Sequence, residues 1–580
     1  MGIPNLIATL EPYAVHSLLR DERVVVDGPA LAYHVLHICR ANGIQQPSNR
    51  LLGSTVIAWL TVLVEHHVSI EAIYFDGYLP SSKLAERMKR TYKTSNQFIR
   101  FVSKQPNGCP RLHVCNRDKD ILIEPFKTGC VEGVAILPPS LLVPAVIHAL
   151  QRSRFKKVVK LVPGEADAYC ARHAAKDSCI VLTSDSDLLV HNLESGRVAF
   201  LRDTHLDTDG VPACAVFVPQ DICKRLGLLP RGLLRLAYEK QLSTHLNLSQ
   251  ILRICAQPVG DEHDYEAFSQ QYLDNETCSL PKLQDGASIL LDNLDPRVSE
   301  LILQLGCAEP RKPINTFLPM LYEDPSRGSA WEPSFHIRQL ACSLARWAIA
   351  GHETTVFEFR RIQAIDQRGR QVNMLNSTSM VSLLNDLATV MRDTKAQTLV
   401  DDESFWIYLC LALDIRDRQV NGKPSHVLET IKHQGSRQQY LDSAHIPWSF
   451  VHFVAHIHAG LYSLRILSQV LSLIPAGAVG ELSASAPFLR DVLSGLPAPE
   501  LHPCAQDVAE FLSQSGPRTV ARVLARFVDV GSDDSREAGS SLSTGKKRQA
   551  KKRKRASQGS SKSMGNGTAG NTFGVLAVDW

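Results

Sequence analysis

Four acidic residues stand in two close pairs within one stretch of the chain, Leu161–Val190. Glu165 and Asp167 form the first pair, and Asp185 and Asp187 form the second. Carboxylates that face one another repel unless cations neutralise them, and hard oxygen ligands suit Mg²⁺ or Mn²⁺. Each pair taken alone has a plainer explanation, as a complement to a helix dipole or as part of a turn. Together the two pairs favour a divalent-metal site.

The surrounding pattern predicts a strand and a helix that would position both pairs. Ile180–Thr183 is a short β-branched run typical of a buried strand, and Asp185 and Asp187 follow its C-terminal end. Sites in open α/β sheets usually lie at this end of the strands. An alanine-rich stretch before the strand predicts a helix, with Glu165 and Asp167 close to its N-terminus.

Two further acids end predicted strands near the start of the chain. The run RVVVD ends at Asp27 and the run IEAIYFD ends at Asp76, and a glycine follows each. Predicted helices over 31–39 and 51–68 separate these strands. Parallel strands joined by helical crossovers gather their C-terminal ends at one edge. The sequence therefore predicts an α/β fold whose parallel sheet collects these acids, although Asp27 alone could be a turn residue.

Basic residues follow Asp76 on a predicted helix that begins near Ser81 or Ser82. Lys83, Arg87 and Arg90 share one face of this helix. Three more cations there are expected to contact the phosphates of a nucleic acid, namely Lys89, Lys93 and Arg100. A solvated amphipathic helix is the alternative, but its start directly after Asp76 favours phosphate contact.

A second basic group precedes Glu165. Its members are Arg152, Arg154, Lys156, Lys157 and Lys160. We expect this group to flank the carboxylates and to contribute to nucleic-acid binding.

The composition is that of a multi-domain globular protein. Of 580 residues, 44% are apolar and 21% are charged, and the net charge is +4. The run KKRQAKKRKR at 546–555 carries eight positive charges, so the rest is slightly acidic. Neither a secretion signal nor a membrane span is expected, because the most apolar later stretch is interrupted by charged and histidine residues. Fourteen cysteines without paired spacing are expected to be reduced thiols.

Five short blocks resemble the flap endonuclease/XPG family of structure-specific nucleases, and more narrowly its Asteroid-like branch. In order along the chain they are MGI, VVVDGPAL, IYFDGYLPSSKLAERMKR, VPGEADAYCA and VLTSDSDLL. One block would be a weak signal, whereas five in this order are specific. The resemblance covers roughly residues 1–200.

The resemblance implies a PIN-like α/β nuclease domain over residues 1–215, with an N-region (about 1–100), a cap or insertion (about 101–145) and an I-region (about 150–200). It implies that six acids hold two divalent ions, and these are Asp27, Asp76, Glu165, Asp167, Asp185 and Asp187. Lys83 matches the active-site lysine of the family, and either Arg87 or Arg90 matches its arginine. Gly2 is expected to pack near the site once Met1 is removed.

The expected activity is hydrolysis of phosphodiester bonds in DNA, with Mg²⁺ or Mn²⁺, by an endonuclease or exonuclease of the flap endonuclease type that acts in DNA repair. Two divalent ions about 3.5–4 Å apart can hold the attacking and the leaving oxygen of one phosphorus. Lys83 and an arginine would stabilise the charge that develops on the phosphate. DNA is favoured over RNA as the partner.

One departure from the family supports a second hypothesis. Residues 217–253 keep a helical pattern but lack the glycine-rich helix-two-turn-helix that grips duplex DNA in the family. The alternative is therefore a weakly active or inactive nuclease-like scaffold that acts through RNA or protein partners in post-transcriptional regulation.

The rest of the chain is predicted to be a mostly helical region at 216–530 and a disordered basic tail at 531–580. His452 and His456 have metal-ligand spacing, but core histidines are the favoured interpretation. The tail carries a predicted nuclear localisation signal for an import receptor, made of Lys546, Lys547, Arg548, Lys551, Lys552, Arg553, Lys554 and Arg555. The expected location is the nucleus, with the cytoplasm second. The apolar end NTFGVLAVDW is a candidate docking motif for a protein partner.

Overall fold

The computed structural model describes residues 2–114, 118, 121–127, 129, 137–273, 279–307, 313–351, 355–397, 402–427, 431, 443–515, 520, 523, 524 and 527. Residues Met1–Val528 form one compact unit, and Asp529–Trp580 form a second. The second unit lies outside the described residues. The predicted tail, the localisation signal of Lys546–Arg555 and the C-terminal apolar motif lie there with it.

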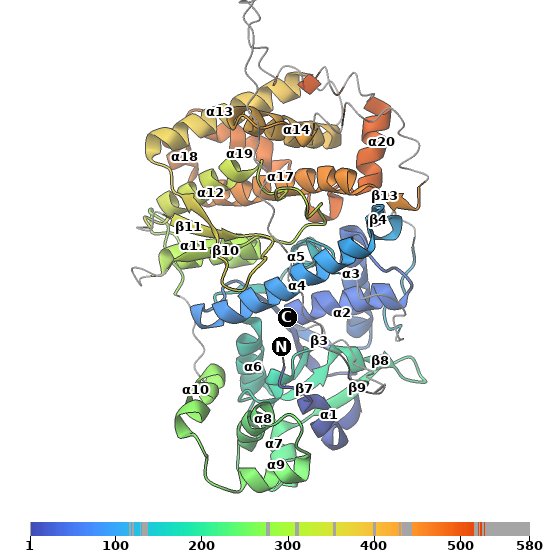
Figure 1. Ribbon diagram of the computed structural model, residues 1–580. Coiled ribbons are helices and arrows are strands. Elements are labelled where there is room, and N and C mark those ends of the chain that lie inside the picture. The colour runs from blue at the N-terminus through green and yellow to red at the C-terminus, as the bar shows by residue number, and fades with distance from the viewer. Residues whose placement is uncertain are drawn as a thin grey trace, which may run out of the picture. The chain divides into compact units, whose positions relative to one another are not determined.

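An eight-stranded, largely parallel sheet lies at the centre of the N-terminal part (Figure 1). Its strands are β1 (Val15–Leu18), β2 (Arg23–Asp27), β3 (Ser69–Asp76), β5 (Val159–Val162), β6 (Ile180–Thr183), β7 (Arg197–Phe200), β8 (His205–Leu206) and β9 (Pro212–Phe217). The order is β1-β9-β7-β6-β2-β3-β5, and β8 pairs with β9. Neighbours from β7 to β5 run parallel, whereas β9 runs antiparallel to β7 and β1. The strands predicted over 23–27, 70–76 and 180–183 are confirmed.

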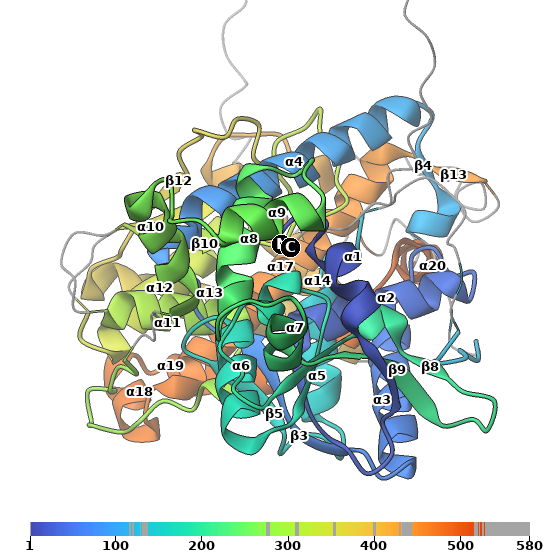
Figure 2. The same ribbon diagram turned by 90° about the horizontal axis from the view of Figure 1, so that it is seen from below.

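The buried strands alternate their side chains between two apolar cores, as a pleated strand requires. Val24 and Val26 of β2 belong to one core, and Val25 between them belongs to the other. The first core is covered by α2 (Gly28–Ala41), α3 (Asn49–Glu65) and α5 (Leu142–Gln151). The second is covered by α1 (Leu6–Leu10), α6 (Ala166–Asp177), α7 (Pro219–Arg225), α8 (Gly232–Leu242), α9 (Leu248–Cys255) and α10 (Glu262–Leu273), several of which face the viewer in Figure 2. The sheet is thus enclosed by helices on both faces, as predicted.

A mostly helical region follows, as predicted. Its helices are α11 (Pro296–Gly306), α12 (Phe335–Ala348), α13 (Ser377–Gln397), α14 (Asp402–Val420), α17 (Trp448–Leu473), α18 (Ala476–Leu482), α19 (Ala486–Ser494) and α20 (Ala505–Ser515). The region also holds a three-stranded sheet that the sequence analysis did not predict. Its strands are β10 (Ile314–Phe317), β11 (Thr355–Phe359) and β12 (Arg370–Asn373), in this order.

The helical region and the central sheet share one apolar core. Trp59 of α3 and Phe450 of α17 belong to the same cluster of buried side chains. The short 3₁₀ helix η7 (Pro499–Leu501) packs on α3 and α5. Asn49 Nδ2 there donates a hydrogen bond to the carbonyl oxygen of Pro499, and His148 Nδ1 lies 2.9 Å from Glu500 Oε2. A segment near the C-terminal end of the described chain therefore covers part of α3 and α5.

The long helix α4 (Leu84–Lys104) runs between the central sheet and the helical region (Figure 1). Phe98 on α4 contacts the ring of Trp448 edge-on, with ring centroids 6.1 Å apart. Ser95 Oγ accepts a hydrogen bond from Ile362 N, at 3.2 Å. Much of the predicted cap at 101–145 lies outside the described residues, and its described part includes β4 (Cys109–Pro110), which pairs with β13 (His445–Ile446).

The histidines of α17 are buried among polar groups. His452 and His456 are 2% and 5% exposed, and His456 Nδ1 lies 3.2 Å from Asp414 Oδ1 of α14. This placement agrees with core histidines. None of the described helices is long and apolar enough to span a bilayer.

Candidate active site

The predicted acids lie along the C-terminal ends of four neighbouring parallel strands. Asp27 ends β2 and Asp76 ends β3, while Asp185 is the second residue after β6 and Glu165 is the third after β5. Because β6, β2, β3 and β5 are adjacent in this order, their ends form one edge. We call the six acids there the carboxylate edge, and its members are Asp27, Asp76, Glu165, Asp167, Asp185 and Asp187.

Asp27 is held from two sides. It is the N-cap of α2 and accepts a hydrogen bond from Ala30 N, at 3.2 Å. Its other oxygen accepts a hydrogen bond from Thr183 Oγ1, at 2.7 Å, and Thr183 Oγ1 accepts in turn from Asp185 N, at 3.0 Å. Desolvation and the charges of nearby Asp167 and Asp185 raise the pKa of Asp27 to about 7.

Asp76 connects the end of β3 to the start of α6. Its Oδ1 accepts a hydrogen bond from Ala166 N, the first residue of that helix, at 2.7 Å. Asp76 is exposed to solvent at the end of β3. Desolvation of its carboxyl group within the site and the charges of Asp167 and Asp27 raise the pKa of Asp76 to about 7. The charge of Asp167 therefore raises the pKa of both Asp27 and Asp76.

Lys83 supplies a positive charge to the carboxylate edge. Its Nζ lies 3.4 Å from Glu165 Oε2, and the two side chains are about a quarter exposed. Desolvation alone would lower the pKa of Lys83, but the charges of Glu165, Asp167 and Asp187 outweigh it and raise this pKa. Desolvation and Asp167 raise the pKa of Glu165 to about 7, against the opposing charge of Lys83. The predicted lysine is therefore at the site.

Asp167 and Asp187 are oriented by residues that the sequence analysis did not single out. His191 Nε2 lies 3.9 Å from Asp167 Oδ2. The neighbouring imidazole of His191, together with the charge of Lys83, outweighs desolvation and lowers the pKa of Asp167. Tyr272 of α10 donates its hydroxyl to Asp187 Oδ2, at 3.3 Å, and its ring contacts the ring of His191 edge-on. Desolvation and Asp185 raise the pKa of Asp187 to about 7.

Gly2 and Ile3, near the start of the chain, lie at this edge. Ile3 N donates a hydrogen bond to Asp187 Oδ1, at 3.1 Å. A Cβ on Gly2 would overlap Ser186 Oγ, so the backbone of Gly2 packs directly on the loop between Asp185 and Asp187. A residue with a side chain would displace that loop.

The carboxylate edge consists of oxygen donors, which Mg²⁺ and Mn²⁺ prefer. Among the described residues, no group of three or more histidine, cysteine, aspartate or glutamate side chains is arranged so that it could hold a metal ion. The chemistry of the six acids nevertheless fits divalent cations.

The two predicted catalytic arginines pair with acids that do not belong to the carboxylate edge. Arg87 Nη1 and Nη2 both donate to Glu300 of α11, the second at 3.3 Å. Its Cζ lies 4.2 Å from the centroid of the Phe317 ring. Arg90 Nε lies 3.5 Å from Glu86 Oε1, one turn earlier on α4. Their assignment to the phosphate stays a prediction, and the contacts show that Arg87 joins α4 to the helical region.

The residues predicted to contact nucleic acid lie in two separate places. Lys89, Lys93 and Arg100 are exposed on one face of α4. Arg152, Arg154, Lys156 and Lys157 are exposed in the loop between α5 and β5. This loop precedes β5, whereas Glu165 follows it, so the expectation that the loop flanks the carboxylates is wrong: it lies at the opposite edge of the sheet. Any binding role of either group stays a prediction.

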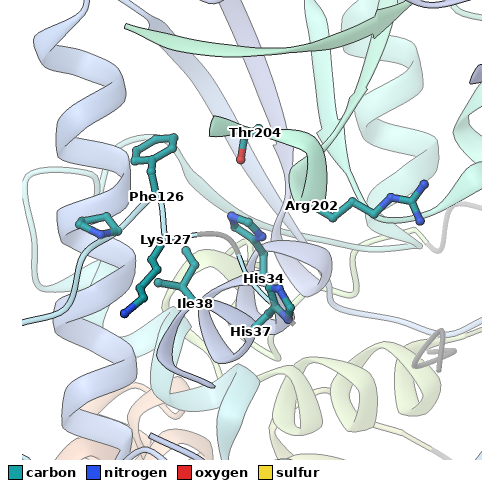
Figure 3. Close-up of a pocket in the computed structure, with 9 residues that line it drawn as sticks. His34, His37, Ile38, Phe126, Lys127, Arg202 and Thr204 are labelled. Atoms are coloured by element: carbon teal, nitrogen blue, oxygen red, sulfur yellow. The ribbon is translucent and has the colours of Figure 1, made fainter. Parts of the chain in front are cut away.

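A separate cavity of about 210 Å³ lies beside α2. Its lining includes His34, His37, Phe126, Arg202 and Thr204. In Figure 3 the Thr204 hydroxyl points toward His34, while the guanidinium of Arg202 extends away from both. The cavity does not gather charges around a common point.

Several site residues had no signal in the local sequence. Thr183 and His191 are close in sequence to predicted acids, and a prediction of hydrogen-bond partners at strand ends could have found them. Tyr272 and Arg297 come from helices far along the chain, and only the tertiary structure brings Tyr272 to Asp187 and the start of α11 to the turn after Asp76.

Comparison with known proteins supports one family. A family model described as "XPG domain containing" matches residues 138–372. This range includes four of the six acids and continues through α11 to the three-stranded sheet. The predicted resemblance to the XPG family is confirmed by this match. No curated protein matches the chain significantly.

Two solved structures show partial likeness. The catalytic core of Rad2 in complex with DNA substrate is 16% identical, with a TM-score of 0.28, over 44% of this chain and 68% of that chain. Flap endonuclease-1 from Methanococcus jannaschii is 14% identical, with a TM-score of 0.29, over 45% of this chain and 83% of that chain.

Proposed function

We propose that this chain, whose residues 138–372 match an XPG domain, is a divalent-metal-dependent, structure-specific nuclease that hydrolyses phosphodiester bonds in DNA. The observation that carries the proposal is the carboxylate edge itself. The acids come from four adjacent strand ends, and their charges raise one another's pKa values. Lys83 forms an ion pair with one of them, Glu165. A purely structural role would give no reason to gather so many like charges.

The carboxylate edge would hold two Mg²⁺ or Mn²⁺ ions, which, when bound, neutralise charge on the phosphate and promote attack by water. The protein side chains have distinct tasks around them. Thr183 orients Asp27, His191 orients Asp167 and Tyr272 orients Asp187. Partners of this kind tune the affinity of metal ligands. Lys83 is placed to attract a phosphate oxygen beside Glu165.

One observation favours a second candidate function. Residues 217–253 lack the glycine-rich helix-two-turn-helix with which the XPG family grips duplex DNA. The alternative is therefore a nuclease-like scaffold that acts through RNA or protein partners. The long helical region that packs on the sheet gives such a scaffold a large surface.

A cleavage assay separates these functions. The full chain is incubated with flap, splayed-arm and single-stranded DNA and RNA, each with Mg²⁺, with Mn²⁺ or with a chelator. The matched control is the double variant Asp185→Ala/Asp187→Ala. We expect metal-dependent cleavage of a branched DNA by the wild-type chain and none by the variant. If no substrate is cut, or if the variant cuts equally, the nuclease proposal fails.

Two further parts of the proposal rest on residues outside the described range. The basic run Lys546–Arg555 would direct the protein to the nucleus through an import receptor, where a role in DNA repair would be exercised. The C-terminal run NTFGVLAVDW would bind a protein partner. Imaging of chains that lack each segment, and partner capture with the same chains, tests the two roles separately.

A further inference from the structure

Arg297 lies in the first turn of α11, and the start of α11 packs against the end of β3. Ser299 Oγ donates a hydrogen bond to the carbonyl oxygen of Gly77, at 2.9 Å. A Cβ on Gly77 would lie 2.8 Å from Ser299 Oγ and would overlap the carbonyl oxygen of Val162. The turn after Asp76 therefore fits against α11 with no room for a side chain.

The start of α11 is also anchored from its other side. Asp295 is the N-cap and accepts a hydrogen bond from Arg297 N, at 3.0 Å. Tyr462 of α17 donates to Asp295 Oδ1, at 2.7 Å, and Arg465 Nε lies 3.4 Å from Asp295 Oδ2. Asp295 is 1% exposed. These contacts fix the position of Arg297 relative to the carboxylate edge.

Arg297 lies two residues before Ser299, and Ser299 contacts the turn that directly follows Asp76, so the first turn of α11 borders the carboxylate edge. Arg297 Nη1 donates to Glu300 Oε2, at 2.9 Å, and 30% of the side chain is exposed. Arg87 is 15% exposed. Glu300 pairs with the nitrogens of its guanidinium group, and the Phe317 ring covers the face of that group. Arg297 is thus the better placed of the two guanidinium groups for a ligand that arrives from solvent.

We propose that Arg297, supplied by the helical region, contacts a phosphate of the bound nucleic acid beside Asp76. This inference rests on the proposed nuclease function and adds a residue to it. Arg87 is then a positioning residue, since its pair with Glu300 holds α4, and with it Lys83, against α11. The helical region would in this way supply part of the phosphate site.

The test compares Arg297→Gln and Arg297→Lys in the full chain, by single-turnover cleavage of the DNA substrate that the wild-type chain cuts best. The matched control is Arg416→Gln, because Arg416 is a half-exposed arginine of α14 whose guanidinium pairs with Asp386. We expect Arg297→Gln to lower the rate about 10²-fold, as for loss of one donor to transition-state charge. Arg297→Lys should restore at least a tenth of the wild-type rate, and Arg416→Gln should match wild type.

Each outcome bears on the inference differently. If wild type cuts and Arg297→Gln cuts equally fast, the inference is overturned and the proposed function stands. If Arg297→Gln and Arg297→Lys are equally slow, the effect is not that of a positive charge at this position, and the inference is again overturned. If wild type cuts no substrate, the proposed function fails and the inference fails with it.

Discussion

Thr183 Oγ1 donates a hydrogen bond to Asp27 Oδ2 across two neighbouring parallel strands. The same hydroxyl accepts from Asp185 N, so one side chain connects the ends of β2 and β6 to the loop that carries the last two acids. Thr183 is fully buried. Its hydroxyl therefore sets the distance between two parts of the carboxylate edge.

Removal of this hydroxyl should weaken both stability and metal binding. Thr183→Val keeps the shape but leaves a buried carboxylate oxygen and a backbone N–H without their partner, which costs about 1–3 kcal/mol. We also expect about 10- to 100-fold weaker Mn²⁺ binding, as for other partners of metal ligands. Urea unfolding and calorimetric titration measure the two effects. Thr183→Ser keeps the hydroxyl and should stay close to wild type, and a Val variant with unchanged metal affinity would contradict the prediction.

Divalent cations should stabilise the folded chain through the carboxylate edge. At a metal concentration 100 times the dissociation constant, binding to the folded state adds about 2.7 kcal/mol. The double variant Asp185→Asn/Asp187→Asn should lose this gain. It should also be more stable than wild type in a chelator, because two like charges are removed from a crowded edge. Unfolding curves with Mg²⁺ and with EDTA test both statements. Equal gains in the two proteins would refute the first, and a variant no more stable than wild type in EDTA would refute the second.

The exposed cations of α4 should dominate the electrostatic attraction to nucleic acid. We expect the triple variant Lys89→Gln/Lys93→Gln/Arg100→Gln to bind a duplex more weakly and to lower the slope of log affinity against log salt by about 2–3. The matched control removes the same charge elsewhere, through Arg392→Gln/Lys395→Gln/Arg416→Gln on α13 and α14. Fluorescence anisotropy over a range of salt concentrations gives the slopes. Equal slopes for the two triple variants would show that α4 is not a contact surface.

A buried ion pair in the helical region should make stability depend on pH below neutrality. Arg338 of α12 donates to Glu358 of β11 at 2.6 and 2.9 Å, and the side chains are 3% and 4% exposed. The charge and hydrogen bonds of Arg338 outweigh desolvation and lower the pKa of Glu358 from 4.5 to about 2. A lowered carboxyl pKa contributes stability above the pKa of the unfolded chain. That contribution is lost as the pH falls from about 4.5 toward 2.

Glu358→Gln should therefore destabilise the protein by about 3–5 kcal/mol at pH 7, since it leaves Arg338 buried without a counter-ion. The difference from wild type should shrink when unfolding is measured at pH 5, 4 and 3. Glu71→Gln is the control, because Glu71 pairs with Arg23 at the surface, where such pairs contribute about 0–1 kcal/mol. A difference that is constant over this pH range would contradict the assigned pKa.

The strands and the acids at their ends could be predicted from the sequence because both have local signals. Buried parallel strands are short apolar runs, and Asp27 and Asp76 end two such runs, so their placement follows from topology alone. The alanine-rich helix and Glu165 followed from equally local signals. The position of Lys83 depended on a helix starting directly at a strand end, which is also local.

Long-range partners could not be predicted in this way. Glu300 pairs with Arg87 although the two lie more than 200 positions apart, and no local sequence pattern near either residue indicates the contact. The loop of Arg152–Lys157 was placed at the wrong edge because closeness to Glu165 in sequence ignores the strand between them. The sheet of β10, β11 and β12 was missed because its strands are only four or five residues long and a helix, α12, separates β10 from β11 along the chain.

The packing of η7 on α3 and α5 has a consequence for biosynthesis. During translation the first helices leave the ribosome long before Pro499–Leu501 exists, so their outer apolar surface stays open while most of the polypeptide is still being made. Final folding must wait for nearly the whole unit to emerge. We therefore expect the nascent protein to depend on holding chaperones over this interval, and a premature stop anywhere in the helical region to yield an aggregating product.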